Sequence, residues 1–344
     1  CLMQNLHFLP ISLVALFFAC TNPSKQTEKA ELTEIYVEGE AQGTTYHIKY
    51  IDSNQTNYKT AFDSILLAID QSVSTYLPTS LISQLNNEED TIILDDIFKA
   101  VYLKSLEIGE KTDYAFDVTL APVTNAYGWG FKNKSTITPQ LIDSLLELVG
   151  VSNFKLSGDT LIKLLPNAML DFNAIAQGYS ADLLADFLDQ QNIQDYMVEM
   201  GGEVKTKGKN VEGEWWRLGV DKPIENAESR KLSAILNLEN EALATSGNYR
   251  KFYVESGVKY SHTINPKTGY PVDHTLLSAS VVSKTGMEAD AYATAFMVLG
   301  LEKAKVILET NPTLDAFLIY ADSTGQFKTF ITPRLEQKIT LVND

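Results

Sequence analysis

The sequence has few cysteines and an excess of negative charge. Its 344 residues include two cysteines, Cys1 and Cys20, and 28 Lys and Arg against 44 Asp and Glu, for a formal net charge of −16. Cleavage before Cys20 would leave one cysteine, which would exclude an intramolecular disulfide and an internal cysteine nucleophile. Nucleic-acid binding needs a basic surface, so the charge argues against that partner. A phosphate-bearing ligand would need local compensation, for which a bound divalent cation is suited.

The common nucleotide-binding loops are also missing. No segment has the spacing G-x-x-x-x-G-K-[ST] of a P-loop, and no G-x-G-x-x-G follows an expected strand. The segment Gly128-Trp129-Gly130 matches only a fragment of the second motif. A dinucleotide would therefore have to bind in a different type of site.

The N-terminal segment is apolar over residues 8–20 and then becomes polar. Its length is typical of the hydrophobic region of a signal peptide and is short for a transmembrane helix. The Ala19-Cys20 pair resembles the end of a bacterial lipobox, so we expect a signal peptide over 1–19, lipidation of Cys20, and a flexible tether over 20–33. An ordinary signal peptide with an incidental Cys20 is the alternative.

The rest of the chain has the composition of a globular protein, with 44% hydrophobic and 21% charged residues overall. Hydrophobic periodicity and turn residues predict short strands mixed with helices. Helices are expected at 57–74, 95–110, 139–149, 174–188, 288–299 and 301–310, and strands or hairpins within 34–51, 153–165, 195–284 and 315–321. Strict βαβ alternation is missing, so we expect an α+β fold with one large domain over 34–335 and a tail over 336–344.

Two segments could hold a flat ring or a phosphate. In residues 116–131 aromatic side chains stand among glycines, which suits stacking on a ring with close approach of backbone amides; a packed aromatic turn is the alternative. In residues 171–179 an apolar strand leads into Asp171 and the start of a helix. Asp171 either caps that helix or lies beside a ligand oxygen held at the helix N-terminus.

Two further segments could supply catalysis and a metal site. Residues 244–271 include His262, one of four histidines, which acts either in catalysis or as a structural hydrogen-bonding residue. In residues 286–295, Asp290 and Thr294 are four positions apart on one expected helix, so their oxygens point the same way. Such hard oxygen ligands suit Mg²⁺ and not zinc. The alternative is a helix-terminal carboxylate and a hydroxyl bonded back to a carbonyl.

Taken in order, these segments resemble the FAD:protein FMN transferase family, also called the ApbE flavin transferase family, over about residues 35–330. The agreement of several separated motifs makes the resemblance specific. The motifs are Gly43-Thr44-Thr45-Tyr46, Ser74-Thr75-Tyr76, Phe116–Gly130, Asp171–Gly178, Gly201-Gly202-Glu203, Ala244–Tyr270 and Ala289–Thr294. The resemblance implies one catalytic domain with a non-Rossmann flavin site between sub-lobes.

The resemblance also implies roles for individual residues. FAD would be bound by Gln42, Tyr76, Ala126, Tyr127, Gly128, Asp171, Gln177 and Ile264. Mg²⁺ would be held by the Ala174 carbonyl, Asp290 and Thr294, and Ala293 could offer only its backbone. Gln42 replaces a methionine that is usual in the family, and Gln177 replaces a frequent lysine, whose lost charge could weaken pyrophosphate binding. His262 or Asp290 would accept the proton of the attacking hydroxyl.

The implied reaction is Mg²⁺-dependent transfer of the FMN half of FAD to a Thr or Ser hydroxyl of another protein, with release of AMP. The implied acceptor carries the motif Asp-x-Ser/Thr-Gly-Ala-Thr in a subunit of Na⁺-pumping NADH:quinone reductase or of the RNF complex. A lipid anchor in the bacterial cell envelope, facing the periplasm, would raise the effective concentration near such membrane-bound targets.

Three alternatives stay open at the level of sequence. An FAD pyrophosphatase would use the same metal site with water in place of the acceptor hydroxyl. A non-catalytic flavin-binding lipoprotein would not need the pair Asp290 and Thr294, which therefore argues against it. A periplasmic solute-binding protein would show a two-lobed βαβ pattern, and this sequence does not.

Overall fold

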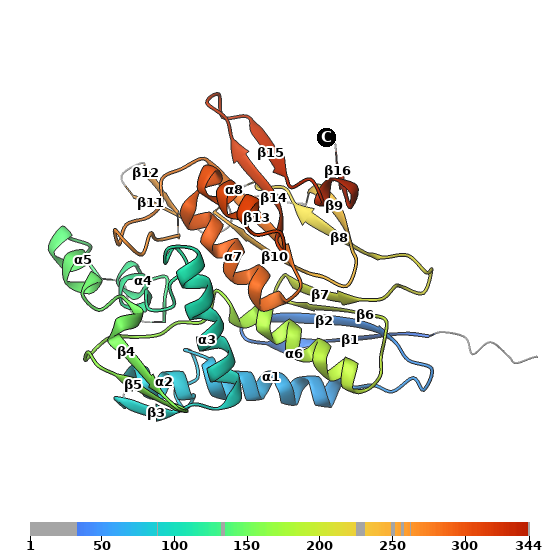
Figure 1. The fold of residues 1–344 in the computed structure, drawn as a ribbon, viewed down its shortest axis with the longest axis horizontal. Helices are drawn as coiled ribbons and strands as arrows, with labels where there is room; N and C mark the ends of the chain where they lie inside the picture. The colour runs from blue at the N-terminus through green and yellow to red at the C-terminus, as the bar shows by residue number, and fades with distance from the viewer. Residues whose placement is uncertain are drawn as a thin grey trace, which may run out of the picture. The chain divides into compact units, whose positions relative to one another are not determined.

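The computed structural model describes residues 33–87, 89–131, 135–224, 231–248, 252–255, 258–261 and 263–342 (Figure 1). The chain divides into two units, Cys1–Glu31 and Leu32–Asp344, and all described residues belong to the second. The expected signal peptide and Cys20 lie outside the described residues. Within the described ranges we find no helix with the length and hydropathy needed to span a bilayer.

The fold is built on a large antiparallel sheet. Among the described residues this sheet has eight strands, in the order β1-β2-β6-β7-β10-β13-β14-β15. The strands are β1 (Glu34–Ala41), β2 (Thr44–Ile51), β6 (Tyr196–Met200), β7 (Glu203–Lys207), β10 (Ala242–Gly247), β13 (Leu276–Ser283), β14 (Asp315–Ala321) and β15 (Phe327–Ile331). Strands and helices are thus mixed without βαβ alternation, which confirms the predicted α+β class.

Four helices contact the strands of this sheet and cover one face of it (Figure 1): α1 (Lys59–Val73), α6 (Ala176–Gln190), α7 (Gly286–Leu299) and α8 (Leu301–Thr310). The described residues also form α2 (Leu81–Asn87), α3 (Asp96–Lys111), α4 (Ala121–Tyr127) and α5 (Pro139–Leu146). Side chains cap two of these helices at their start: Asp95 accepts the Phe98 amide at 2.7 Å, and Thr138 accepts the Leu141 amide at 3.2 Å. The apolar spacing of α1 also holds, because Phe62, Leu66, Ile69 and Val73 are all buried.

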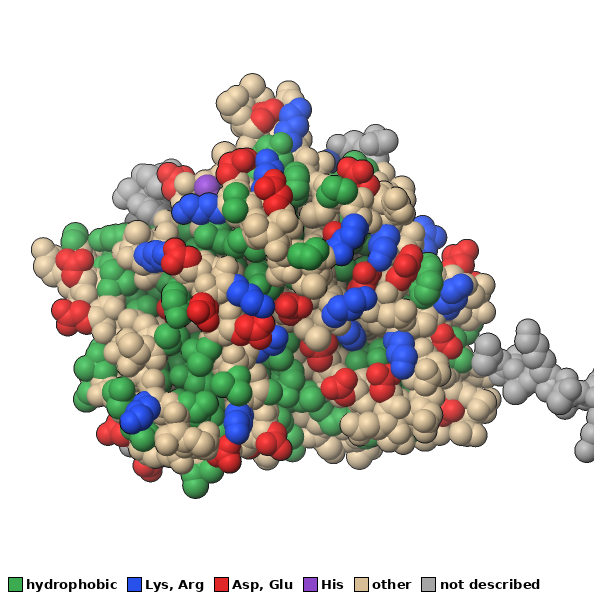
Figure 2. Space-filling view, viewed as in Figure 1, with side chains coloured by type: hydrophobic (Ala, Val, Ile, Leu, Met, Phe, Trp, Pro, Cys, Tyr) green, Lys and Arg blue, Asp and Glu red, His purple; other side chains and the backbone are tan. Residues whose placement is uncertain are grey.

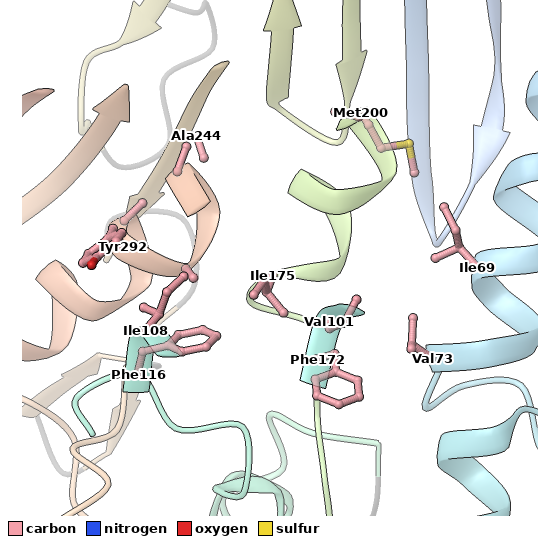
Figure 3. Packing of buried hydrophobic residues seen from close by; sticks show 14 of the residues in the cluster. Ile69, Val73, Val101, Ile108, Phe116, Phe172, Ile175, Met200, Ala244 and Tyr292 are labelled. Atoms are coloured by element: carbon pink, nitrogen blue, oxygen red, sulfur yellow. The ribbon is translucent and has the colours of Figure 1, made fainter. Parts of the chain in front are cut away.

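The main core lies between the helices and the sheet. Figure 3 shows Ile69 and Val73 of α1 beside Val101 of α3 and Phe172 and Ile175, which precede α6. Phe98 and Phe172 meet edge to face with ring centroids 5.2 Å apart. This packing fixes the loop before α6 against α1 and α3.

A second apolar layer covers the other face of the sheet. Successive residues of a strand point to opposite faces, and on β10 Ala244 joins the helix-side core while Leu243 joins a separate cluster with Leu236, Phe317 and Ile319. That cluster is covered by a small sheet of β16 (Ile339–Leu341), β9 (Leu232–Leu238) and β8 (Trp216–Asp221). Smaller sheets are formed by β3 (Thr91–Ile93), β5 (Thr160–Lys163) and β4 (Phe154–Ser157), and by β11 (Phe252–Glu255) and β12 (Val258–Ser261).

The structure corrects three expectations. The strand at 315–321 is not the last, because β15 pairs with it beyond a turn. Residues 336–344 are not simply a tail, because β16 pairs with β9. Part of the aromatic loop within 116–131 is the short helix α4, which ends at Gly128 with φ of 78°. In each case the strand or helix forms through pairing or packing with distant residues, and the local sequence pattern does not show this.

Candidate functional site

A cavity of about 940 Å³ lies between the β1–β2 turn, the end of α1 and the start of α6. Its volume is in the upper part of the usual range for small-molecule sites. The lining residues are Gln42, Gly43, Thr44, Leu67, Ile69, Asp70, Val73, Ser74, Tyr76, Leu77, Trp129, Asn173, Ala176, Gln177 and Gly201. A smaller cavity of about 360 Å³ on the sheet of β8, β9 and β16 contains none of the residues expected at the site.

Three residues expected to bind the flavin nucleotide line the cavity. Gln42 lies in the β1–β2 turn with φ of 55°, and its Nε2 donates to Ser180 Oγ of α6 at 2.8 Å. Tyr76 follows α1, and its side chain is 68% exposed. Gln177 lies in the first turn of α6 against Gly201, where an added Cβ would be 2.8 Å from its Nε2. The structure thus brings together residues from three separate segments of the chain.

Asp171 precedes the cavity-lining Asn173, whose amide donates to Asp171 Oδ1 at 2.8 Å. Burial raises the pKa of Asp171 above its ordinary value, and the bonds from Asn173 oppose this shift. The carboxylate therefore forms a local turn with Asn173. The amide that Asp171 accepts, that of Asn173, lies before the start of α6 at Ala176 and not in the first turn of that helix.

Tyr127 and Ile264 were expected to bind the flavin nucleotide, but they lie in a buried cluster behind Trp129, which lines the cavity. Both side chains are buried, at 4% and 3% exposure, in a small cluster with Val123 and Ile142. Ala126 is also buried, at 6% exposure. Tyr127 stacks on Trp129 with ring centroids 5.1 Å apart and an interplanar angle of 12°.

Trp129, which sequence reasoning did not single out, is the aromatic residue of this segment that faces the cavity. The sequence feature that could have identified Trp129 is the position of its large aromatic ring between two glycines, Gly128 and Gly130.

The expected metal residues lie where α7 meets the start of α6. Asp290 is 6% exposed, and its Oδ2 accepts the Gly178 amide at 3.2 Å. Burial raises the pKa of Asp290 to about 7. Thr294 follows one turn later, with its Oγ1 at 3.3 Å from Ser246 Oγ of β10. Ala293 is fully buried, and Ala174 lies in the turn that leads into α6.

Two contacts hold α6 and α7 together at this point. Asp182 of α6 accepts the amides of Gly286 and Met287, at 2.7 Å and 2.9 Å, and so caps the start of α7. A Cβ added at Gly178 would overlap the Gly286 carbonyl oxygen and lie 2.8 Å from the Asp290 Cβ. The helices therefore approach as closely as they do because both positions are glycine.

Glu203, the first residue of β7, is a buried carboxylate beside this junction. It is 8% exposed, and its Oε2 has no hydrogen-bond partner among the described residues. Burial, and next the charge of Asp290, raise the pKa of Glu203 well above its ordinary value. Sequence reasoning assigned Glu203 no role, although the Gly201-Gly202-Glu203 motif contains it.

These oxygen donors fit a divalent cation. Asp290, Thr294 and a backbone carbonyl are hard ligands, and a cation would stabilise buried carboxylates in their ionised form. The described residues contain no group of three or more His, Cys, Asp or Glu side chains that could hold a metal by themselves. Mg²⁺ commonly keeps several waters and binds through one or two carboxylates together with substrate phosphates, which agrees with this sparse set.

His262, the other expected catalytic residue, lies outside the described residues. Its neighbour Thr263 donates its hydroxyl to Asn248 Oδ1 at 2.8 Å. The role of His262 therefore stays a prediction.

The buried carboxylates predict that the metal-free protein becomes less stable as pH rises. Burial raises the pKa of Asp182 to about 6 and that of Asp290 to about 7, above their values in the unfolded chain. Stability from such groups is fully present below the unfolded pKa and is lost as pH rises through the folded pKa, by about 1.4 kcal/mol for each tenfold difference in proton affinity between the folded and unfolded states. We expect a larger free energy of unfolding at pH 6 than at pH 8.

Urea unfolding in EDTA would measure this difference, and Asp290→Asn should make the pH dependence shallower. An equal or greater stability at pH 8 would contradict the assignment of raised pKa values. Mg²⁺ should reduce the loss at high pH, because it binds the ionised carboxylates.

Comparison with known proteins identifies the family of the chain. The chain matches the model of the ApbE family over residues 42–318. The FAD:protein FMN transferase of Haemophilus influenzae is 36% identical, with 92% of this chain and 93% of the relative covered. That of Vibrio cholerae is 32% identical, with 94% and 98% covered.

Solved structures of the same family share the fold. The flavin transferase ApbE from Vibrio cholerae superposes with a TM-score of 0.81 at 30% identity, covering 89% of this chain and 99% of that one. The apo flavinyl transferase ApbE of Pseudomonas stutzeri gives 0.79 at 30% identity, covering 89% and 97%. The chain therefore belongs to the ApbE family.

Proposed function

We propose that this protein transfers the FMN half of FAD to a Thr or Ser hydroxyl of another protein, in a reaction that depends on Mg²⁺ and releases AMP. The observation that supports this most is the cavity that runs to the α6 N-terminus, next to the buried Asp290. The related enzymes are named FAD:protein FMN transferase, which supports flavin transfer as the reaction class.

The cavity offers suitable partners for the flat rings and for the pyrophosphate of FAD. Tyr76 and Trp129 present aromatic rings on which a flat ring system can stack. Ala176 and Gln177 lie in the first turn of α6, where backbone amides and the helix dipole favour phosphate oxygens. The same helix start reaches Asp290 through the Gly178 amide. The pyrophosphate would therefore lie between the aromatic part of the cavity and the cation ligands.

Asp290, Thr294 and the Ala174 carbonyl would hold Mg²⁺, which neutralises charge on the pyrophosphate and on the leaving AMP. The acceptor hydroxyl forms a bond to the FMN-side phosphorus, and the bond to the AMP oxygen breaks. The proton of the hydroxyl passes to a protein base. A carboxylate that binds a cation must stay ionised, so if Asp290 is a cation ligand, His262 is the base that we propose.

On the face in Figure 2, acidic and basic side chains are interspersed. The net charge of −16 is therefore not gathered into one acidic patch on that face. Long-range repulsion of an anionic substrate still follows from the net charge, and a bound cation at the site would offset it locally.

The decisive experiment uses the chain without residues 1–20, FAD, Mg²⁺ and a protein that carries the motif Asp-x-Ser/Thr-Gly-Ala-Thr. We expect a fluorescent acceptor band and released AMP, both lost with EDTA. Free FMN and AMP without a labelled acceptor would replace the proposal with an FAD pyrophosphatase. Bound, intact FAD would replace it with a flavin-binding protein that has no catalytic role.

The cellular setting is part of the same proposal. Lipidation of Cys20 would hold the enzyme at the bacterial cell envelope, facing the periplasm, near acceptors of the Na⁺-pumping NADH:quinone reductase or RNF type. Membrane fractionation of cells that express the full chain or a Cys20→Ser variant tests this, and equal membrane retention of both would contradict it.

Gln177→Lys is expected to tighten FAD binding by about 10-fold, the scale of one charge-assisted hydrogen bond. The reason is that Gln177 lines the cavity at the α6 N-terminus, where a cation would meet the pyrophosphate. Fluorescence quenching of FAD measures the dissociation constant. The control is Leu67→Lys, which adds the same charge to an exposed lining position on α1. An equal gain in both variants would reflect the overall charge and contradict a local contact.

A further inference from the structure

The turn between β6 and β7 places Glu203 under the α6–α7 junction. Met200 pairs with Glu203 in the sheet, so the turn consists of Gly201 and Gly202 alone. Their φ values of 65° and 113° are in the left-handed region that favours glycine. Strand β7 contacts both α6 and α7. The side chain of its first residue is therefore enclosed next to the helix that carries Asp290.

One oxygen of the buried Glu203 carboxylate is not satisfied by protein groups. Its Oε2 has no hydrogen-bond partner among the described residues. Lys205, two residues along the same strand, donates instead to the Lys284 carbonyl oxygen. A buried carboxylate oxygen without a partner is destabilising, and more so when the group is ionised. A ligand of opposite charge would remove that destabilisation.

The neighbouring strand offers a direct contrast. Glu199 on β6 has both carboxylate oxygens bonded, one to His47 Nδ1 at 2.6 Å and one to the Gly202 amide at 2.7 Å. Both oxygens of Glu199 therefore have protein partners, and this carboxylate needs no ligand. Glu203 begins β7, and this strand contacts α7, the helix that carries the buried Asp290. Two buried carboxylates on neighbouring elements repel each other unless a proton or a cation lies between them.

We propose that Glu203 supplies the second carboxylate charge of the cation site formed around Asp290 and Thr294. The inference rests on the cation dependence of the proposed function and adds a residue to it. Asp290 and Glu203 together carry two negative charges, which balance one divalent cation. The two-glycine turn then has a functional reason, since it brings the β7 carboxylate to the buried face of the helix pair.

The test measures cation binding directly. Mn²⁺ is titrated into the metal-free wild-type protein and into Glu203→Gln, Glu203→Met and Asp290→Asn, alone and with FAD, and free Mn²⁺ is followed by electron paramagnetic resonance. We expect the dissociation constant for Mn²⁺ to rise by at least about 10-fold in each Glu203 variant, the range seen when groups that support a metal site are lost. Isosteric Glu199→Gln, which removes an already bonded carboxylate, should change it by less than about 2-fold.

A second measurement separates this role from a structural one. The melting temperature of metal-free Glu203→Gln and Glu203→Met should equal or exceed that of the wild type, because the variants lose a buried acid with an unpartnered oxygen. Added Mg²⁺ should raise the melting temperature of the wild type and of Glu199→Gln more than that of either Glu203 variant.

The outcomes distinguish the inference from the function on which it rests. Unchanged Mn²⁺ affinity in both Glu203 variants, together with weak binding by Asp290→Asn, would overturn the role of Glu203 alone. Wild-type protein that binds no Mn²⁺ with or without FAD would overturn the cation dependence as well. Glu203 variants that are less stable without metal and keep wild-type affinity would show that the carboxylate is structural.

Discussion

Asp290→Asn is expected to lower Mg²⁺-dependent flavin transfer by about 100- to 1,000-fold, the usual effect of removing one essential electrostatic group from an active site. The substitution removes the charge that would hold the cation. It keeps the size of the side chain and an oxygen that can accept the Gly178 amide. AMP release and in-gel fluorescence of the acceptor, measured against Mg²⁺ concentration, report the loss.

The control for this variant lies on the same helix. Glu288→Gln removes a carboxylate two residues earlier that accepts the Ser283 hydroxyl, away from the Gly178 contact. It should keep most of the activity. Near-wild-type turnover in Asp290→Asn would contradict the assignment of Asp290 to the cation. Loss of the cooperative unfolding transition in that variant would show instead that the residue is structural.

Gly178→Ala is expected to reduce the free energy of unfolding by about 3 kcal/mol, at the upper end of the range for overpacking a close contact. The new methyl group would overlap the Gly286 carbonyl oxygen and press on the Asp290 Cβ. Backbone atoms cannot move aside as a flexible side chain can. The two helices must separate, and we expect FAD and cation binding to weaken with stability.

A second glycine gives the matched control for this effect. Gly158, in the β4–β5 turn, has φ of 63° and no atoms within 4 Å of an added Cβ. Gly158→Ala should cost only about 1 kcal/mol, the penalty for a left-handed alanine, and should leave ligand binding unchanged. Urea unfolding of both variants compares the two costs. Equal costs would mean that the α6–α7 contact can relax without consequence.

Much of the local structure could be predicted from the sequence, because short-range patterns encode it. The apolar spacing of residues 62–73 predicted α1, and the helices expected at 95–110 and from 139 are present as α3 and α5. Asp290 and Thr294 were placed on one helix by their spacing alone. The order of the motifs indicated the ApbE family, which the family match over residues 42–318 confirms.

Only the tertiary structure decided which distant residues meet. Gly178, Glu203 and Asp290 come from a helix start, a strand start and a second helix, and no local periodicity links them. They are brought together by the antiparallel order of the sheet and by the close contact between Gly178 of α6 and Gly286 of α7. The same holds for Trp129, which faces the cavity because Tyr127 packs beneath it. Sequence patterns fix which face of an element is buried, whereas close packing between elements fixes which polar groups are left without a partner.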